Sequence, residues 1–170
     1  MIGRLRFDLV YKETSVRFRL YISKMIGRCS EVDDIMQEAF LRMLTTAPPS
    51  LNNNQLQSYL FATATNIVRD SWRRGRVAGD WMPLDEVTAG VATIGENVLA
   101  KIDTERALSN LSIVQRSIVW LAYAEGYSHR EIAQIINIKE NSVRVLLFRA
   151  KNKLINELKK SYTTQWDLSQ

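Results

Sequence analysis

The chain has 170 residues, of which 46% are hydrophobic and 24% are charged, and its formal net charge is +5. This length allows one large domain or two small ones, and the basic bias suits a polyanionic partner without requiring one. A single cysteine and a single histidine exclude an internal disulfide and a structural zinc site, so we expect no metal and no cofactor. The sequence has neither a signal peptide nor an apolar run of about 18 residues, which predicts a cytoplasmic protein with no membrane insertion.

Helical periodicity recurs along the chain, and strand signals are almost absent. The one clear break, residues 77–96, contains glycines and a proline and shows no sustained period. Long structureless segments are uncommon inside compact domains, so this segment is best interpreted as a flexible linker. We therefore predict an all-α chain with a small helical domain over residues 1–76, a second over 97–160, and a polar tail over 161–170.

The first predicted helices contain an amphipathic segment with an acidic outer face. Residues 30–44 begin at a capping serine, carry acids in the first turn and place their apolar residues on one side. The opposite side consists of Asp33, Asp34, Gln37, Glu38, Leu41 and Arg42. An acidic face is unsuited to DNA, and it is either solvated or a protein-binding surface with Leu41 at its centre. Periodicity alone does not choose between the two.

An amide-rich loop follows over residues 45–57 and includes Asn52, Asn53 and Asn54. Amide side chains can read the edge of an unpaired base, but they are equally common in surface turns. The next predicted helix, residues 58–76, combines arginines with Tyr59, Phe61 and Trp72, in the manner of a surface that binds single-stranded nucleic acid. Arginines at a helix C-terminus also complement the helix dipole, so the charge alone decides little.

The segment from Ser128 to residue 158 predicts a helix-turn-helix. Ser128 and Glu131 form a capping box, Asn137 tolerates the left-handed backbone that ends a helix, and a second helix runs from about Glu140. Its outward face carries Asn141, Arg144, Val145, Phe148, Arg149 and Lys151. These groups suit base edges and phosphates in the major groove. The plainer alternative is a solvated helix of an all-α bundle, against which stands Phe148 on a face that should be polar.

Three motifs, in this order, resemble those of the extracytoplasmic-function (ECF) sigma factors of the sigma-70 family, and the resemblance covers nearly all of residues 7–158. Residues 33–42, DDIMQEAFLR, are similar to the family's acid-rich D-x-x-Q-E-x-F-L-R segment. Residues 59–74 are similar to its W-L-x-x-I-A-x-N-x-x-x-D-x-x-R-R helix, and residues 125–150 to its E-G-x-S-x-x-E-I-A…T-V-[KR]…R-A signature. One motif would be weak evidence, but three in order with a linker between the second and third are strong.

The resemblance implies a non-enzymatic subunit that binds core RNA polymerase, at the β′ clamp coiled coil and the β flap, and directs initiation at specific promoters. It implies that the polymerase-binding residues are Asp33, Asp34, Gln37, Glu38 and Leu41. Those for recognition and melting of the −10 element would be Asn52, Asn53, Asn54, Tyr59, Asn66, Arg69, Trp72, Arg73 and Arg74. Those for the −35 element would be Asn141, Ser142, Arg144, Val145, Phe148, Arg149 and Lys151. Family members are usually restrained by an anti-sigma factor, and in the free protein we expect the domains to pack together or to be held by such an inhibitor.

Departures from the family pattern lie mostly in the second domain. Asn137 and Lys139 replace a common glycine and a capping serine, and because lysine is a poor cap the recognition helix would start less firmly. Ser112 replaces a frequent proline. Val145 and Leu146 occupy positions that are often polar, so the −35 sequence read here would differ from the commoner ones.

Two other functions remain open at this stage. A stand-alone helix-turn-helix regulator would bind duplex DNA without polymerase and would not melt it. A sigma mimic would act only by binding a regulator, which the basic recognition face disfavours. The aromatics and arginines of residues 59–74 favour the sigma factor. In the linker, Trp81 and Met82 are the expected anchors on polymerase.

Overall fold

The computed structural model of the protein describes residues 2–26, 29–78 and 107–167, with side chains described for 2–26, 31–74 and 107–160. Within these ranges every regular element is a helix, which confirms the all-α prediction. The helices are α1 (Arg4–Ile26), α2 (Cys29–Thr46), α3 (Asn53–Ala78), α5 (Ile113–Tyr123), α6 (His129–Ile136) and α7 (Glu140–Asp167). Most of the predicted linker, including Trp81 and Met82, lies outside the described residues.

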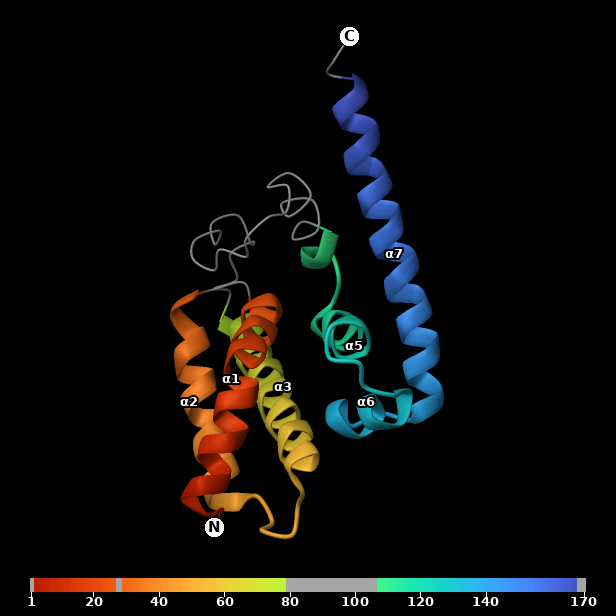
Figure 1. Ribbon diagram of the computed structural model, residues 1–170. Coiled ribbons are helices and arrows are strands. Elements are labelled where there is room, and N and C mark those ends of the chain that lie inside the picture. The colour runs from red at the N-terminus through yellow and green to blue at the C-terminus, as the bar shows by residue number, and fades with distance from the viewer. Residues whose placement is uncertain (1, 27–28, 79–106, 168–170) are drawn as a thin grey trace.

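Helices α1, α2 and α3 form the N-terminal half (Figure 1). Aromatic side chains fill its core: the ring of Phe18 packs edge-on against Phe40 and Phe61, with centroid distances of 5.5 and 5.4 Å. Tyr21 is fully buried, and its hydroxyl lies 2.6 Å from the hydroxyl of Thr65. Phe61 is also fully buried. The prediction that Phe61 belongs to a base-stacking surface is therefore wrong, because the ring is needed in the core.

The helix-turn-helix is present in the C-terminal half as predicted. Ser128 and Glu131 form both bonds of a capping box at the start of α6. Asn137 ends this helix with φ 55° and ψ 57°, a left-handed conformation that asparagine tolerates better than most residues. Ser112 starts α5 with a second capping box, shared with Gln115. The serine that replaces the family's frequent proline thus begins the helix through a capping box.

Three helices differ from the predicted ones in their boundaries. Helix α3 begins at Asn53, inside the expected loop, because Asn52 caps it: the Asn52 Oδ1 accepts from the Gln55 amide at 2.9 Å, and the Gln55 Oε1 accepts from the Asn52 amide at 2.8 Å. Helix α2 begins at Cys29 and ends at Thr46. Helix α7 continues to Asp167, through most of the segment predicted as a tail, and extends well beyond its neighbours (Figure 1).

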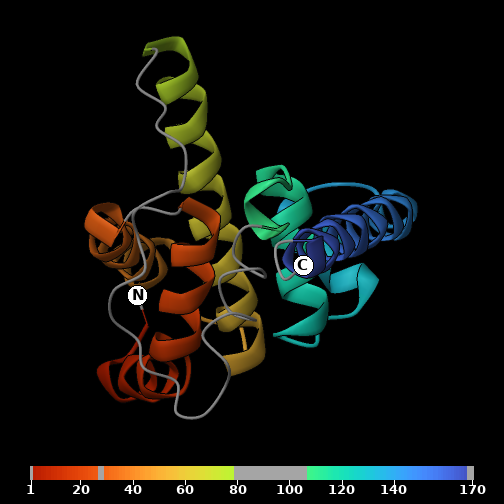
Figure 2. The same cartoon turned by 90° about the horizontal axis from the view of Figure 1, so that it is seen from above.

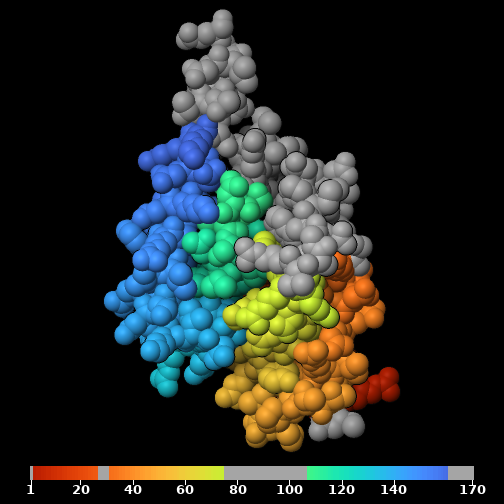
Figure 3. Space-filling model, turned by 180° about the vertical axis from the view of Figure 1, so that it is seen from behind, coloured from red at the N-terminus to blue at the C-terminus, as the bar shows by residue number. Residues whose placement is uncertain are grey.

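The two halves pack against each other, α1 against α5 and α3 against α6 (Figure 2). Seen from behind, the surface of α3 meets that of the C-terminal helices directly (Figure 3). Arg17 of α1 pairs with Glu125 at 3.1 Å, and the side chain of Glu125 is almost fully buried. None of the described helices is long and apolar enough to span a bilayer.

A buried arginine ties the halves together. The side chain of Arg116 in α5 donates to the carbonyl of Met25 at 3.2 Å and to that of Lys24 at 3.4 Å, both at the end of α1. Within its own half it donates to the carbonyls of Leu111 at 3.0 Å and Ser109 at 3.2 Å. Burial lowers the pKa of the Arg116 guanidinium, and the four carbonyl oxygens offset part of the cost of burying its charge.

Candidate nucleic-acid and polymerase interfaces

The outward face of α7 is exposed as predicted. Val143 and Ala150 turn to the core, whereas the side chains of Val145 and Phe148 are 48% and 66% exposed. The exposed polar members of this face are Asn141, Arg144, Arg149 and Lys151, and Ser142 is half-buried. Because the turn at Asn137 fixes the direction of α7, these groups project from one side of the helix-turn-helix. They offer donors for base edges, donors for phosphates and an apolar ring.

The asparagine-rich segment lies at the end of the bundle, next to α1. Asn52, Asn53 and Asn54 border an open hollow of about 400 Å³ together with Arg6. The Arg6 Nε donates to the Asn53 Oδ1 at 3.2 Å, and a terminal nitrogen of Arg6 donates to the carbonyl of Pro49 at 3.0 Å. Sequence reasoning missed Arg6, because nothing local to an arginine in the first turn of α1 indicates a partner 47 residues away.

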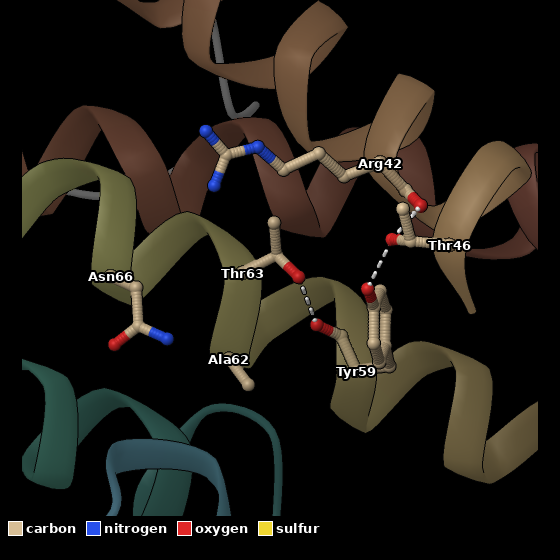
Figure 4. Close-up of a pocket in the computed structure, with 6 residues that line it drawn as sticks. All are labelled: Arg42, Thr46, Tyr59, Ala62, Thr63 and Asn66. Carbon is tan, nitrogen blue, oxygen red and sulfur yellow. Dashed lines mark hydrogen bonds between the residues drawn. The ribbon is translucent and has the colours of Figure 1, made fainter. Parts of the chain in front are cut away.

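A second hollow, of about 480 Å³, lies between α2 and α3 and is bordered by Arg42, Thr46, Tyr59, Ala62, Thr63 and Asn66 (Figure 4). The Thr46 hydroxyl donates to the carbonyl of Arg42 at 2.7 Å and also lies 2.7 Å from the Tyr59 hydroxyl. Since the Thr46 proton is already used, Tyr59 donates this second bond. Tyr59 is half-buried, and this bond fixes the direction of its hydroxyl. Asn66, in contrast, is exposed.

The basic residues of α3 do not form a single strip. Arg73 and Arg74 are exposed, with Arg74 donating to the carbonyl of Asp70 at 3.3 Å and Arg73 lying 3.8 Å from its carboxylate. Arg69 is instead half-buried and donates to the carbonyl of Ile136, at the end of α6, at 3.2 Å. Trp72 is half-buried and packs against the core. Of the predicted −10 residues, the structure leaves these exposed: Asn52, Asn54, Asn66, Arg73 and Arg74.

The acidic face of α2 is also exposed. Asp33 pairs with Arg19, whose guanidinium holds the pKa of that carboxyl below its usual range. Glu38 pairs with Arg42 at 2.6 Å, one turn further along the helix. Asp34 and Gln37 are exposed, and Leu41 is 55% exposed although it is a large apolar side chain. An apolar group surrounded by charges suits the centre of a protein-binding surface.

The described residues contain neither a metal-binding cluster nor a set of acids that converge on one point. No group of three or more histidine, cysteine, aspartate or glutamate side chains in these ranges could hold a metal ion. The exposed acids of α2 lie along a helix face rather than around a common point, which is unlike an active site.

Both halves of the chain match known protein families. Residues 11–77 match the family described as Sigma-70 region 2, and residues 102–154 match Sigma-70, region 4. The chain is 26% identical over 151 residues to the ECF RNA polymerase sigma factor SigW of Bacillus subtilis, covering 80% of each chain. It is 29% identical over 152 residues to the ECF RNA polymerase sigma factor SigM of Mycobacterium tuberculosis, covering 89% of this chain and 76% of the relative.

The fold has a counterpart among solved structures. The sigma factor RpoE from Bartonella quintana, in complex with the anti-sigma factor NepR, superposes with a TM-score of 0.75 at 23% identity, covering 90% of this chain and 96% of that one. Both sigma-70 regions therefore occur in order on one all-helical chain, and its relatives are ECF factors over most of their length. The chain belongs to the sigma-70 family and is an ECF sigma factor.

Proposed function

We propose that this ECF sigma factor directs promoter-specific initiation through three separate surfaces. The exposed face of α7 reads the −35 duplex, the hollow at Asn52–Asn54 and the adjoining α3 surface hold the melted −10 element, and the acidic face of α2 binds the polymerase. The observation that carries the proposal is that each surface presents exposed side chains on its own element while the opposite face of that element is buried in the core.

At the −35 element, Arg144 and Arg149 would meet base edges and phosphates in the major groove. Arginine pairs bidentately with guanine, and an apolar side chain such as Phe148 packs against a thymine methyl. Lys151 lies further along the exposed side and would contact a phosphate, with Asn141, Ser142 and Val145 completing the surface. Phosphate contacts fix position, whereas base contacts carry sequence preference.

At the −10 element, opening the duplex costs a few kcal/mol for each base taken out of the stack. The chain has no nucleotide-binding loop, so binding of the opened strand must offset that cost. Arg73 and Arg74 would hold phosphates, Tyr59 and Trp72 would border the strand, and the asparagines would receive an unpaired base. Asn66 would also contact the strand. Arg69 would do so once its hydrogen bond to the Ile136 carbonyl breaks.

On the polymerase side, Asp34 and Gln37 flank the exposed Leu41, with Asp33 and Glu38 beside them. The apolar group supplies contact area, while the acids supply orientation and encounter rate toward a basic partner. The β′ clamp coiled coil is the proposed docking site. The β flap is the proposed partner of the C-terminal half.

The packing of the two halves implies that they separate on the promoter. Two elements about two helical turns apart, near 70 Å at roughly 34–36 Å per turn, cannot both be reached by domains in direct contact. A linker of roughly 20 residues averages about 25 Å as a flexible coil and reaches about 65–70 Å when extended. An anti-sigma factor is a proposed partner of the packed form, and the likeness to a sigma factor solved with its anti-sigma factor supports it.

The test is run-off transcription with purified core RNA polymerase on a library of supercoiled promoters, which also identifies the promoter. We expect initiation with the wild type and its loss in the double variant Asp34→Ala/Glu38→Ala. The matched control, Asp8→Ala/Glu13→Ala, removes two exposed acids from α1 and should leave initiation intact. Duplex binding by the wild type without any polymerase-dependent initiation would instead support a stand-alone regulator.

A further inference from the structure

The Asn53 side chain is held by an arginine from another helix. Arg6 lies in the first turns of α1, and Asn53 is the first residue of α3. The guanidinium spans the loop, with one nitrogen on the Asn53 side-chain oxygen at 3.2 Å and another on the Pro49 carbonyl at 3.0 Å. Both residues border the same hollow of about 400 Å³, which is within the usual size range for small-ligand sites.

This contact determines which end of the Asn53 amide is available. A guanidinium has five donors and no acceptor, so only the amide oxygen of Asn53 can face it. The amide nitrogen is left to donate to whatever enters the hollow. The positive charge of Arg6 also disfavours a second donor at the same oxygen, because the two donors would compete beside a fixed cation.

The neighbouring asparagines do not duplicate this arrangement. Asn52 uses its side-chain oxygen and its backbone amide in the cap with Gln55. Asn54 is exposed on the outer side of the first turn of α3. Asn53 is the half-buried member of the three, and its fixed amide presents only its nitrogen to a base, whereas a freely rotating amide can present both ends.

We propose that Arg6 is a positioning residue that denies adenine the two-point pairing that a free Asn53 amide would give it in the base-capture site. This inference rests on the proposed function of the asparagine-rich segment. An asparagine with both amide ends free pairs bidentately with adenine, using its oxygen and its nitrogen. With the oxygen engaged by Arg6, Asn53 is a donor only, so it can bond one acceptor atom on any of the four bases, and adenine gains no second bond from its amino group.

The experiment uses the holoenzyme and fork-junction DNA from the promoter identified by run-off transcription. Each unpaired −10 position carries A, C, G, T or an abasic site in turn, and affinity is measured by fluorescence anisotropy. For the wild type we expect adenine to bind no more tightly than the other bases at the position that meets Asn53. In Arg6→Ala adenine should gain about tenfold relative to the other bases there, while affinity for the abasic probe should stay equal to that of the charge-matched control Arg4→Ala.

Two further variants separate positioning from folding. Arg6→Lys keeps the charge but loses the two-point contact, so adenine should gain as it does in Arg6→Ala. Asn53→Asp still pairs with Arg6 but presents only acceptors, so the preference should move toward the bases that offer an amino donor: adenine, cytosine and guanine. A loss of folding would lower the affinity for every probe alike, the abasic one included, and would not change the order of the bases.

An adenine affinity that does not rise relative to the other bases in Arg6→Ala overturns the positioning role and leaves the base-capture function standing. A wild-type affinity that is the same for the abasic probe as for every base, at each unpaired position, overturns the base-capture function itself, and the positioning role with it.

Discussion

The two proposed DNA-binding regions differ in how far their polar groups are already engaged inside the protein. On α7, Arg144 and Arg149 are exposed and make no hydrogen bond to any described residue. At the asparagine-rich segment, Asn52 caps α3 and Asn53 is held by Arg6. A duplex presents a rigid edge to which mobile side chains adapt. An unpaired base has no fixed position, and a preformed site lowers the ordering cost of receiving it.

The largest effect should come from α7, whose exposed arginines make no hydrogen bond to any described residue. Arg144→Ala should lose about 1–3 kcal/mol of discrimination at one −35 base pair, because one base contact is removed, and the melting temperature should stay unchanged because the side chain is exposed. Anisotropy on duplexes with each base pair substituted in turn measures this. A loss of equal size for every sequence would instead identify Arg144 as a phosphate contact.

A matched pair of asparagine substitutions tests the comparison directly. Asn52→Ala removes the cap of α3 and should lower the free energy of unfolding by about 1 kcal/mol. Asn141→Ala removes a similar exposed side chain from α7 and should change it by no more than about 0.5 kcal/mol. Thermal or urea denaturation of both variants gives the two values. Equal losses would mean that both regions are engaged to the same extent.

The smallest effect concerns pH, because α3 and α6, the first helix of the helix-turn-helix, begin with different capping groups. Amides cap α3, whereas α6 begins with a capping box of Ser128 and the Glu131 carboxylate, and the hydrogen bonds from Ser128 hold the pKa of that carboxyl below its usual range. A carboxylate whose pKa is lower in the folded state stabilises the fold above its unfolded pKa. This stability is lost as the pH falls through the folded pKa.

We therefore expect Glu131→Gln to weaken the dependence of the melting temperature on pH between pH 7 and pH 3.5. The contribution should be no more than about 0.5 kcal/mol, because the carboxylate is exposed and screened by solvent. Gln55→Glu should introduce a similar dependence at α3. Identical pH profiles for the wild type and Glu131→Gln would show that the cap does not titrate in this range.

Local signals predicted the fold well. The capping box at Ser128 and the left-handed Asn137 each depend on residues within one turn, and both are present. Predictions from residue type alone are wrong where the fold gives the residue another role. An aromatic ring fits a core as well as a base, so Phe61 was misassigned. The Asn-Asn-Asn run is typical of a turn, so the cap at Asn52 was missed.

Contacts between distant segments could not be predicted. The partner of Arg6 is 47 residues away, and the Met25 carbonyl bonded by Arg116 is 91 residues away. Neither arginine carries a local pattern that separates it from an ordinary surface charge. Such contacts become visible only when the helices that carry them are placed side by side.

The Arg116 contact also has a consequence for apparent affinity. In the proposed separation of the halves, the Arg116 bonds to the Lys24 and Met25 carbonyls break and the surfaces packed between α1 and α5 meet water, so only a fraction of molecules is open at any moment. A partner that binds only the open form sees its dissociation constant raised by the inverse of that fraction, about 100-fold if one molecule in about 100 is open. The strength of one buried arginine contact therefore helps to set the polymerase concentration at which this sigma factor begins to compete for the enzyme.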